Sequence, residues 1–273
     1  MNVARLRSLL RSLKQRKRNI KRRHRLRSAD VVIVSHAKSG RTWLSAMISH
    51  LYHQRYGIDH SKLLRMDNFH RINPQIPKIF MTHDSRKTHT WRPLAGLDQF
   101  AGKKVIFLVR DPRDVLVSAY FHFTRRHRHR EDLSLMAFAF EEQLPRLVDF
   151  MRKWADDIGK IESSMTLRYE DLRRQPQEEL ARVAAFIGGG FSDEMIGQAV
   201  EFASYENLQA LERQRFFDTS RLHPGDGTDP ESFKVRRAQV GGYRDHLSAE
   251  DLAAVERFIG ADLLVRFGYR TDA

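Results

Sequence analysis

The sequence has no cysteine and no long apolar run. The lack of cysteine excludes disulfide bonds, a thiolate nucleophile and any metal site built on thiolate ligands. The longest apolar runs, residues 105–109 and 135–140, are much shorter than the roughly 20 residues that cross a bilayer. The chain also lacks the apolar stretch of a secretory signal. We therefore expect a cytoplasmic protein without a membrane anchor.

Acidic residues are absent from residues 1–27, which hold 12 of the 48 lysines and arginines. The rest of the chain has 36 basic and 34 acidic residues, so the net charge of +14 belongs almost entirely to this segment. Its apolar residues recur at helical spacing: Val3, Leu6, Leu10 and Leu13. This pattern predicts a basic amphipathic tail, residues 1–29, that binds an anionic membrane surface at the inner face of a membrane. An acidic polymer, a solvated extension and an organelle presequence are the alternatives, and nothing indicates specific nucleic-acid recognition.

Residues 30–273 are long enough to form one large α/β domain. Short apolar runs alternate with amphipathic helical patterns, which predicts a P-loop-like parallel sheet flanked by helices in three layers, α/β/α. We expect strands near residues 31–35, 78–82, 105–109 and 165–168. We expect helices near residues 41–55, 113–123, 133–158, 177–187, 192–201, 204–214 and 248–266.

A strand, a basic turn and a helix follow one another over residues 31–44. Four β-branched residues lead into the turn Lys38-Ser-Gly-Arg-Thr42, after which apolar positions recur at helical spacing. Backbone N–H groups at the positive end of a helix, one ammonium and a glycine that allows close approach suit such a turn to phosphate. It is not a Walker A loop, because the lysine precedes the glycine. A basic turn that only opens a surface helix is the alternative.

Two later segments repeat the passage from strand to helix. Residues 104–120 contain a buried strand with Arg110 at its carboxyl end, and Ser118 follows within about two helical turns. Residues 165–172 contain another strand that runs into a helix. Ligands of open α/β sheets collect at the carboxyl ends of the strands, which predicts one shared crevice. The residues expected to line it are Lys38, Arg110, Ser118 and Tyr169.

Four segments resemble, in the same order, the motifs of the PAPS-dependent sulfotransferase family. They are Lys38-Ser-Gly-Arg-Thr-Trp43, Arg110-Asp-Pro-Arg-Asp-Val-Leu-Val-Ser118, Tyr169-Glu-Asp-Leu172 and Arg236-Arg-Ala-Gln-Val-Gly-Gly-Tyr243. The resemblance spans most of the chain, which is similar to a cytosolic-type, bacterial-like sulfotransferase domain. It implies an enzyme that moves the sulfuryl group of 3′-phosphoadenosine 5′-phosphosulfate (PAPS), its co-substrate, to an acceptor hydroxyl or amine. The product would be 3′,5′-adenosine bisphosphate (PAP), and no metal is implied.

The resemblance also implies which residues bind the donor. Those implied for the 5′-phosphosulfate are Lys38, Ser39, Gly40, Arg41 and Thr42. Those implied for the 3′-phosphate are Arg110, Ser118, Arg236, Arg237 and Gly241. Those implied for the nucleoside are Trp43, Tyr169, Ser204 and Tyr205. For the tryptophan, packing in the core is the alternative.

Sulfuryl transfer needs a base for the acceptor proton and a cation for the charge that grows on the leaving 5′-phosphate. Lys38 is placed to supply the cation. His83 follows the predicted strand 78–82 in a Thr-His pair that resembles the one carrying the family's catalytic base. The ordinary pKa of histidine lies close to working pH, which suits this task.

Four positions depart from the family's pattern: Ala37, Arg41, Met81 and Ala238. Arg41 stands where many relatives have threonine, and its guanidinium would strengthen anion binding. Ala238 replaces a glycine in the last motif, next to the residues implied for the 3′-phosphate.

Other classes of function remain open from the sequence. A P-loop-type nucleotide kinase or NTPase shares the physics of the first turn, although no Walker B carboxylate follows a strand. A non-enzymatic anionic-polymer binder would explain the tail and the basic run 125–130. His127 and His129 lie in that run among arginines that repel a metal cation. The acceptor is not readable, so a sugar, a lipid-linked sugar or a small molecule remains, because the motifs bind only the donor.

Overall fold

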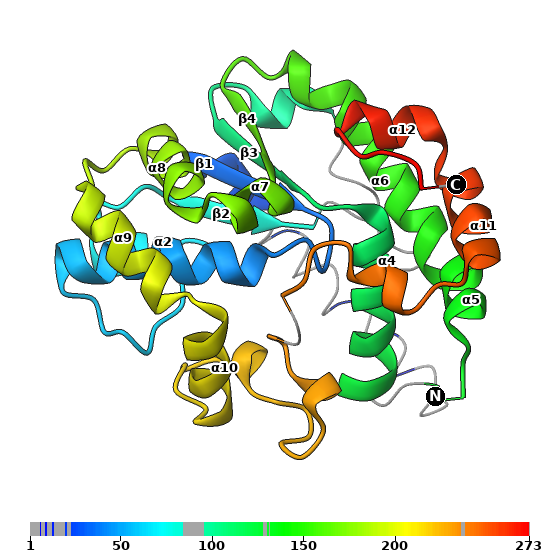
Figure 1. Cartoon of the computed structure of the whole chain (residues 1–273). Coiled ribbons are helices and arrows are strands. Elements are labelled where there is room, and N and C mark those ends of the chain that lie inside the picture. The colour runs from blue at the N-terminus through cyan, green and yellow to red at the C-terminus, as the bar shows by residue number, and fades with distance from the viewer. Residues whose placement is uncertain are drawn as a thin grey trace.

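The structure is a computed structural model. It describes residues 23–83, 96–127, 130, 132–235 and 238–272, together with Leu6, Leu9, Leu13 and Ile20. A 4-stranded sheet of order β2-β1-β3-β4 lies between two layers of helices (Figure 1). The strands are β1 (Val31–Ser35), β2 (Ile79–Thr82), β3 (Lys104–Val109) and β4 (Ser164–Arg168). All neighbouring strands are parallel, as predicted.

The helices follow the strands in alternation. They are α2 (Arg41–Tyr56), α3 (Asn68–Ile72), α4 (Pro112–Phe121), α5 (Leu135–Phe138), α6 (Leu144–Asp157), α7 (Tyr169–Arg174), α8 (Pro176–Ile187), α9 (Asp193–Phe202), α10 (Tyr205–Arg213), α11 (Ala249–Ile259) and α12 (Ala261–Arg266). Single π-helical turns extend α4 (His122–Arg126) and join α5 to α6 (Ala139–Gln143). Among the residues described, no helix is long and apolar enough to cross a membrane.

The central strands are apolar on both faces, as buried parallel strands usually are. In β1, Val32 and Val34 belong to one core cluster, whereas Val31 and Ile33 belong to the other. Successive side chains of a strand point to opposite faces, so one short sequence supplies both cores. The three-layer α/β arrangement predicted from the alternating pattern is confirmed.

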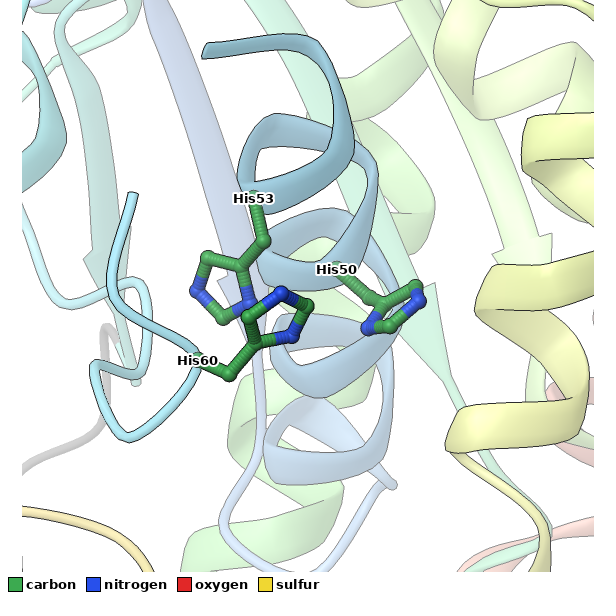
Figure 2. Close-up of side chains that lie close together, drawn as sticks. All are labelled: His50, His53 and His60. Carbon is green, nitrogen blue, oxygen red and sulfur yellow. The ribbon is translucent and has the colours of Figure 1, made fainter. Parts of the chain in front are cut away.

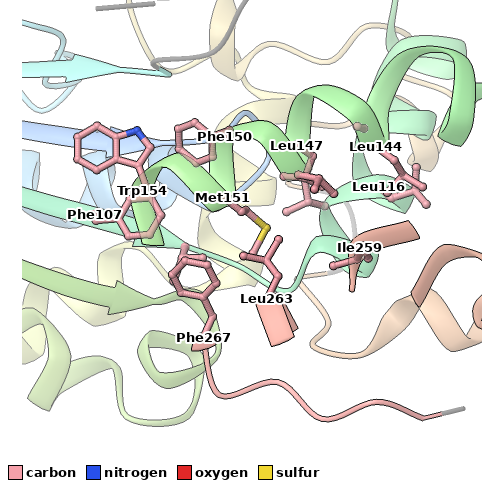
Figure 3. Close-up of a cluster of buried hydrophobic side chains, with 14 of the residues drawn as sticks. Phe107, Leu116, Leu144, Leu147, Phe150, Met151, Trp154, Ile259, Leu263 and Phe267 are labelled. Carbon is pink, nitrogen blue, oxygen red and sulfur yellow. The ribbon is translucent and has the colours of Figure 1, made fainter. Parts of the chain in front are cut away.

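The first core joins the sheet to α4, α5, α6, α11 and α12 and is rich in aromatic side chains (Figure 3). Phe107 of β3 stacks on Trp154 of α6, with ring centroids 5.5 Å apart and planes 16° apart. Phe267, which follows α12, packs against Phe107 from the other side of the cluster. The chain's C-terminal helices are therefore fixed to the central strand that carries Arg110 at its end.

The second core joins the opposite face to α2, α3, α8 and α9 and is mainly aliphatic. Helix α2 contributes Leu44, Met47, Ile48 and Leu51 at helical spacing, all fully buried. The helix begins directly after the phosphate-type turn, so this burial holds the turn rigidly against the sheet.

Two predicted helices are divided in the structure. The helix expected over 133–158 contains a π-helical turn between α5 and α6. The helix expected over 248–266 breaks at Gly260, whose φ of 90° no interior helical residue adopts. Helix α3 was not predicted, because its five residues are too few to show a periodic pattern.

The described part of the tail has two different environments. Leu6, Leu9, Leu13 and Ile20 are exposed, with 40%, 53%, 45% and 67% of their surface accessible. Leu26, by contrast, is fully buried in the first core. Leu26 therefore packs in the core, although it lies inside the segment 1–29 that we expected to be a tail.

Candidate active site

A cavity of about 390 Å³ is lined by residues that follow each of the four strands. This places the predicted crevice residues together, at the strand ends where α/β sheets bind ligands. The predicted site residues on its wall are Lys38, Gly40, Arg41, Thr42, Trp43, His83, Arg110, Ser118, Tyr169 and Tyr205.

The β1–α2 turn, residues 36–40, is a strained backbone loop. Lys38 has a φ of 75° and Gly40 a φ of 91°, both in the left-handed region. A Cβ on Gly40 would lie 2.5 Å from a ring carbon of Tyr169, so only glycine fits there. Gly40 caps α2 without a side-chain hydrogen bond, and no acidic residue occupies the first turn of this helix. Amides and a helix dipole of this kind favour an anion.

His83 lies at the end of β2 with both ring nitrogens bonded to residues near the first turn. Its Nδ1 lies 3.0 Å from the carbonyl oxygen of Ser35, and its Nε2 lies 2.7 Å from a guanidinium nitrogen of Arg41. Because Arg can only donate, Nε2 must accept, and the ring proton is therefore assigned to Nδ1. Burial, together with Arg41, holds the pKa of His83 well below its usual value. The imidazole is neutral, with its lone pair on the nitrogen that faces Arg41.

Arg110 lies at the end of β3 over the aromatic ring of Tyr169, 4.2 Å from the ring centroid. It donates to the carbonyl oxygens of Lys38 (3.3 Å) and Gln239 (3.0 Å), and its nearest carboxylate, on Asp114, is 3.5 Å away. Its Nε is buried and has no hydrogen-bond partner within the described residues. This arginine is held by neutral carbonyl oxygens and keeps one unused donor. It is therefore suited to bind a phosphate.

Arg113, three residues later, has a different environment. Its guanidinium is 3% exposed and forms an ion pair with Asp111 at 2.7 Å and a second one with Glu256 of α11. The side chain of Asp111 also accepts the amide of Arg113 (2.9 Å) and so caps α4, and Pro112 supplies no N–H at the first helical position. Arg113 is thus neutralised within the fold.

Trp43 lies on the cavity wall beside Tyr169, in edge-to-face contact with 5.7 Å between centroids. Its Nε1 donates to the carbonyl oxygen of Ala203 (2.8 Å), and the guanidinium of Arg173 lies 5.3 Å from its ring. The indole is partly buried, so the site and the core-packing interpretations both describe part of its surroundings.

Other predicted site residues lie away from this wall. Ser39 is buried beneath the turn, and the hydroxyl of Ser204 caps α10 by accepting the amide of Asn207 (3.3 Å). The amide of Gly241 donates to Asp114 (2.9 Å), which fixes the last motif beside α4. Arg236 and Arg237 lie outside the described residues.

Several wall residues were not predicted. They include Asp114, His122, His127, Arg173, Lys234, Gln239 and His246. Positions 114 and 122 lie four residues on either side of Ser118, so their common helix face was a usable signal. Gln239 lies in the last motif without having been named as a site residue, and Lys234 and His246 flank that motif, where the sequence shows no local pattern.

The cavity is strongly cationic. Burial, with Lys38 and Lys234 nearby, holds the pKa of His122 far below its usual value, so this imidazole stays neutral. The lysines and arginines of the wall outnumber its single carboxylate, Asp114. Such a chamber attracts a polyanionic ligand.

The Sulfotransferase domain family matches residues 28–264 of this chain, which covers most of its length. The chain belongs to this family. It is a PAPS-dependent transferase, which decides between the enzyme classes that the sequence left open.

The curated relatives are plant and animal proteins of similar length. Cytosolic sulfotransferase 7 of Arabidopsis thaliana is 25% identical over 90% of this chain and 83% of its own length. The amine sulfotransferase of Oryctolagus cuniculus is 21% identical over 87% of this chain and 82% of its own length. These relatives do not support the bacterial-like subtype suggested by the motifs.

Solved structures show the same fold. Retinol dehydratase in complex with androsterone and the inactive cofactor PAP superposes with a TM-score of 0.62, at 18% identity, over 87% of this chain and 81% of that chain. A mouse sulfotransferase complexed with PAP gives a TM-score of 0.59, at 17% identity, over 85% and 83%.

Proposed function

We propose that this chain transfers the sulfuryl group of PAPS in line to an acceptor hydroxyl or amine, with His83 as general base. The observation that carries this proposal is the position of His83, whose Nε2 lone pair faces Arg41 in the cavity that Lys38 also lines. The acceptor proton moves to Nε2, a bond forms from the acceptor to sulfur, and the bond from sulfur to the 5′-phosphate oxygen breaks. PAP leaves with the added charge.

The β1–α2 turn fits the 5′-phosphosulfate. The residues proposed to bind it are Lys38, Ser39, Gly40, Arg41 and Thr42. Lys38 is assigned to the charge that grows on the leaving phosphate oxygen, where a preorganised cation lowers the barrier. The left-handed Gly40 at the start of α2, with no side-chain cap on the helix, supports a ligand contacted by backbone at this position.

Arg41 has a second role in this proposal. Its guanidinium donates to the same nitrogen that the base needs. An anionic donor competes for that guanidinium, since a charged acceptor binds it more strongly than a neutral imidazole. Donor binding would then free Nε2 for the acceptor, which orders the two substrates.

The 3′-phosphate is assigned to Arg110 and Ser118, with Arg236 and Arg237. The buried unpaired Nε of Arg110 supports this assignment. Gly241 is assigned to the shape of the loop, because its amide is already donated to Asp114. The nucleoside is assigned to Trp43 and Tyr169, with Ser204 and Tyr205 beyond them.

The acceptor class is a sugar, a lipid-linked sugar or a small molecule. The test is incubation of the enzyme with PAPS labelled with radioactive sulfur and a lysate of its source, followed by isolation of the labelled product. We expect a product with wild-type enzyme and almost none with His83→Asn. Equal labelling by both proteins would exclude the proposed base.

We propose that residues 1–27 hold the enzyme on the inner face of an anionic membrane, in the cytoplasm. The exposed leucines at positions 6, 9 and 13 support an apolar helix face, and each nearby Lys or Arg adds about 1 kcal/mol at an anionic surface. A variant that starts at Arg23 keeps the buried Leu26. Cosedimentation with anionic vesicles at low salt should be lost in this variant, with an unchanged melting temperature. Equal binding by both proteins would contradict the proposal.

A further inference from the structure

Three histidines form a cluster outside the cavity (Figure 2). His50 and His53 lie one turn apart on α2, and His60 follows in the loop after the helix. One ring nitrogen from each histidine lies within 4.8 Å of those of the other two. The close-up shows the three rings gathered in one place, with those of His53 and His60 side by side.

The two rings on α2, one buried and one half-buried, have Nδ1 atoms that the described part of the fold leaves unpaired. His53 Nε2 lies 2.8 Å from the carbonyl oxygen of Lys62, to which it must donate, so the lone pair of this ring is on Nδ1. The Nδ1 atoms of His53 and His50 are both buried and lack a hydrogen-bond partner in the part of the chain described here. Burial also lowers the pKa of each of these two histidines to about 4, which keeps them neutral.

The ring orientations are fixed by neighbours. His50 stacks on Phe202 of α9 with 4.3 Å between centroids, and the Lys62 carbonyl holds His53. A second partner on the far nitrogen is the usual arrangement behind a metal-bound histidine, because it sets the tautomer and the direction of the ring. Packing alone explains the stack on Phe202, but not two buried, unpaired Nδ1 atoms within a cluster of three imidazoles.

We propose that His50, His53 and His60 form a binding site for one divalent transition-metal ion of the zinc class. Neutral imidazole suits Zn²⁺, Co²⁺, Ni²⁺ and Cu²⁺, whereas Mg²⁺ and Ca²⁺ prefer oxygen ligands. The site is separate from the proposed chemistry, and its metal would pin the loop after Gly57 to α2.

The distances require a small closure. Tetrahedral zinc with bonds of about 2.0–2.1 Å to nitrogen places its ligand atoms about 3.4 Å apart. His60 is exposed and lies three residues after Gly57, whose φ is 63°. Small side-chain rotations close the three nitrogens from at most 4.8 Å to this spacing, and the exposed His60 is the freest of the three to move. The fourth ligand position is left for water.

The experiment uses the full-length protein after treatment with a chelator. Zn²⁺ is titrated by calorimetry, Co²⁺ is titrated by the visible absorption of its tetrahedral complex, and the melting temperature is recorded with and without Zn²⁺. We expect one ion per chain and a higher melting temperature with Zn²⁺, since a ligand that binds only the folded state stabilises it.

His60→Ala is the main variant, because this exposed side chain can be removed without opening the core. Loss of an outer-shell partner lowers metal affinity by roughly 10–100-fold. Loss of the ligand itself should lower Zn²⁺ affinity by more than this and abolish the thermal shift. His50→Ala should behave alike. The matched control is His24→Ala, another exposed histidine, which should bind Zn²⁺ as the wild type does. Unchanged affinity in His60→Ala, or no binding by the wild type, would overturn the proposal.

Discussion

The two strand-to-helix turns at the centre of the sheet occupy equivalent places and are built in opposite ways. The β1–α2 turn (residues 36–40) is long, has two left-handed residues and offers backbone amides and cations to the cavity. The β3–α4 turn (Arg110-Asp111) is short, and its helix start is closed by Asp111 and Pro112. The first turn can therefore bind an anion with its backbone, whereas the second can do so only through the side chain of Arg110.

This difference also separates the two arginines of the second turn. Arg113 is paired with Asp111 and Glu256 inside the fold, and Arg110 is held mainly by carbonyl oxygens at the cavity. Arg113 thus stabilises the fold, whereas the proposal assigns Arg110 to ligand binding. Variants of each turn test the comparison.

The largest expected effect is on His83, which is bonded to Ser35 and Arg41 on either side of the first turn. His83→Asn should reduce turnover by roughly 10²–10⁴-fold, the usual range for loss of a general base, with PAP affinity almost unchanged. Steady-state rates and calorimetry measure the two quantities. Retained turnover would show that another residue is the base and that the first turn serves only to bind the donor.

Arg113→Ala should destabilise the protein by about 3–5 kcal/mol, because it leaves two buried carboxylates without their partner. Chemical denaturation measures this loss, and Arg110→Ala is the comparison that should lose less, because its single carboxylate partner, Asp114, is 3.5 Å away and also accepts the amides of Gly241 and Tyr243. A variant at Arg113 that folds normally but no longer binds PAP would reverse the assignment of the two arginines.

Lys38→Ala should cost about 3–4 kcal/mol of transition-state stabilisation, the effect of removing one preorganised charge donor. PAP affinity should fall less than turnover, since the charge on the leaving oxygen is greatest in the transition state. Equal losses in both quantities would limit Lys38 to donor binding.

Arg110→Ala should weaken PAP binding by about 10–150-fold, as expected for hydrogen bonds to a charged group. Ser118→Ala should weaken it by only about 2–10-fold, since its donor is neutral. Both variants should lose preference for PAP over adenosine 5′-phosphate, which lacks the 3′-phosphate. Calorimetry with the two nucleotides decides this, and unchanged discrimination would place the 3′-phosphate elsewhere.

The smallest effect concerns pH. The pKa of His83 is well below 6.5, because of burial first and Arg41 second, so the neutral base is fully present at neutral pH and turnover should fall only in acid. Arg41→Ala removes one cause in the free enzyme and should move the acid limb of kcat/KM for PAPS to higher pH. An unmoved limb would show that Arg41 does not act on the base.

The strands were predictable, because buried parallel strands are continuous apolar runs. The position of the first three motifs at the strand ends was predictable too, because each directly follows a strand. The helix breaks were not, since the π-helical turns after α4 and α5 leave no mark in the apolar spacing. Gly260 indicates a possible helix end in the sequence, but the apolar spacing on both sides of it favoured one continuous helix.

The cavity wall was predictable only where it is local in sequence. Lys234 and His246 lie outside the last motif, in a distant segment whose position depends on the contact of Gly241 with Asp114. The histidine cluster could not be predicted from the sequence for the same reason. The spacing on α2 relates His50 to His53, but no sequence pattern places His60 against them.

The most direct test of the central claim compares two nucleotides on the wild-type protein. Melting temperatures are measured with PAP plus EDTA and with ATP plus Mg²⁺. We predict a clear rise with PAP, equivalent to about 2.7 kcal/mol when its concentration is 100 times the dissociation constant, and a much smaller rise with ATP. A larger rise with ATP and Mg²⁺, or none with PAP, would contradict the assignment of the two turns to the donor's two anionic ends.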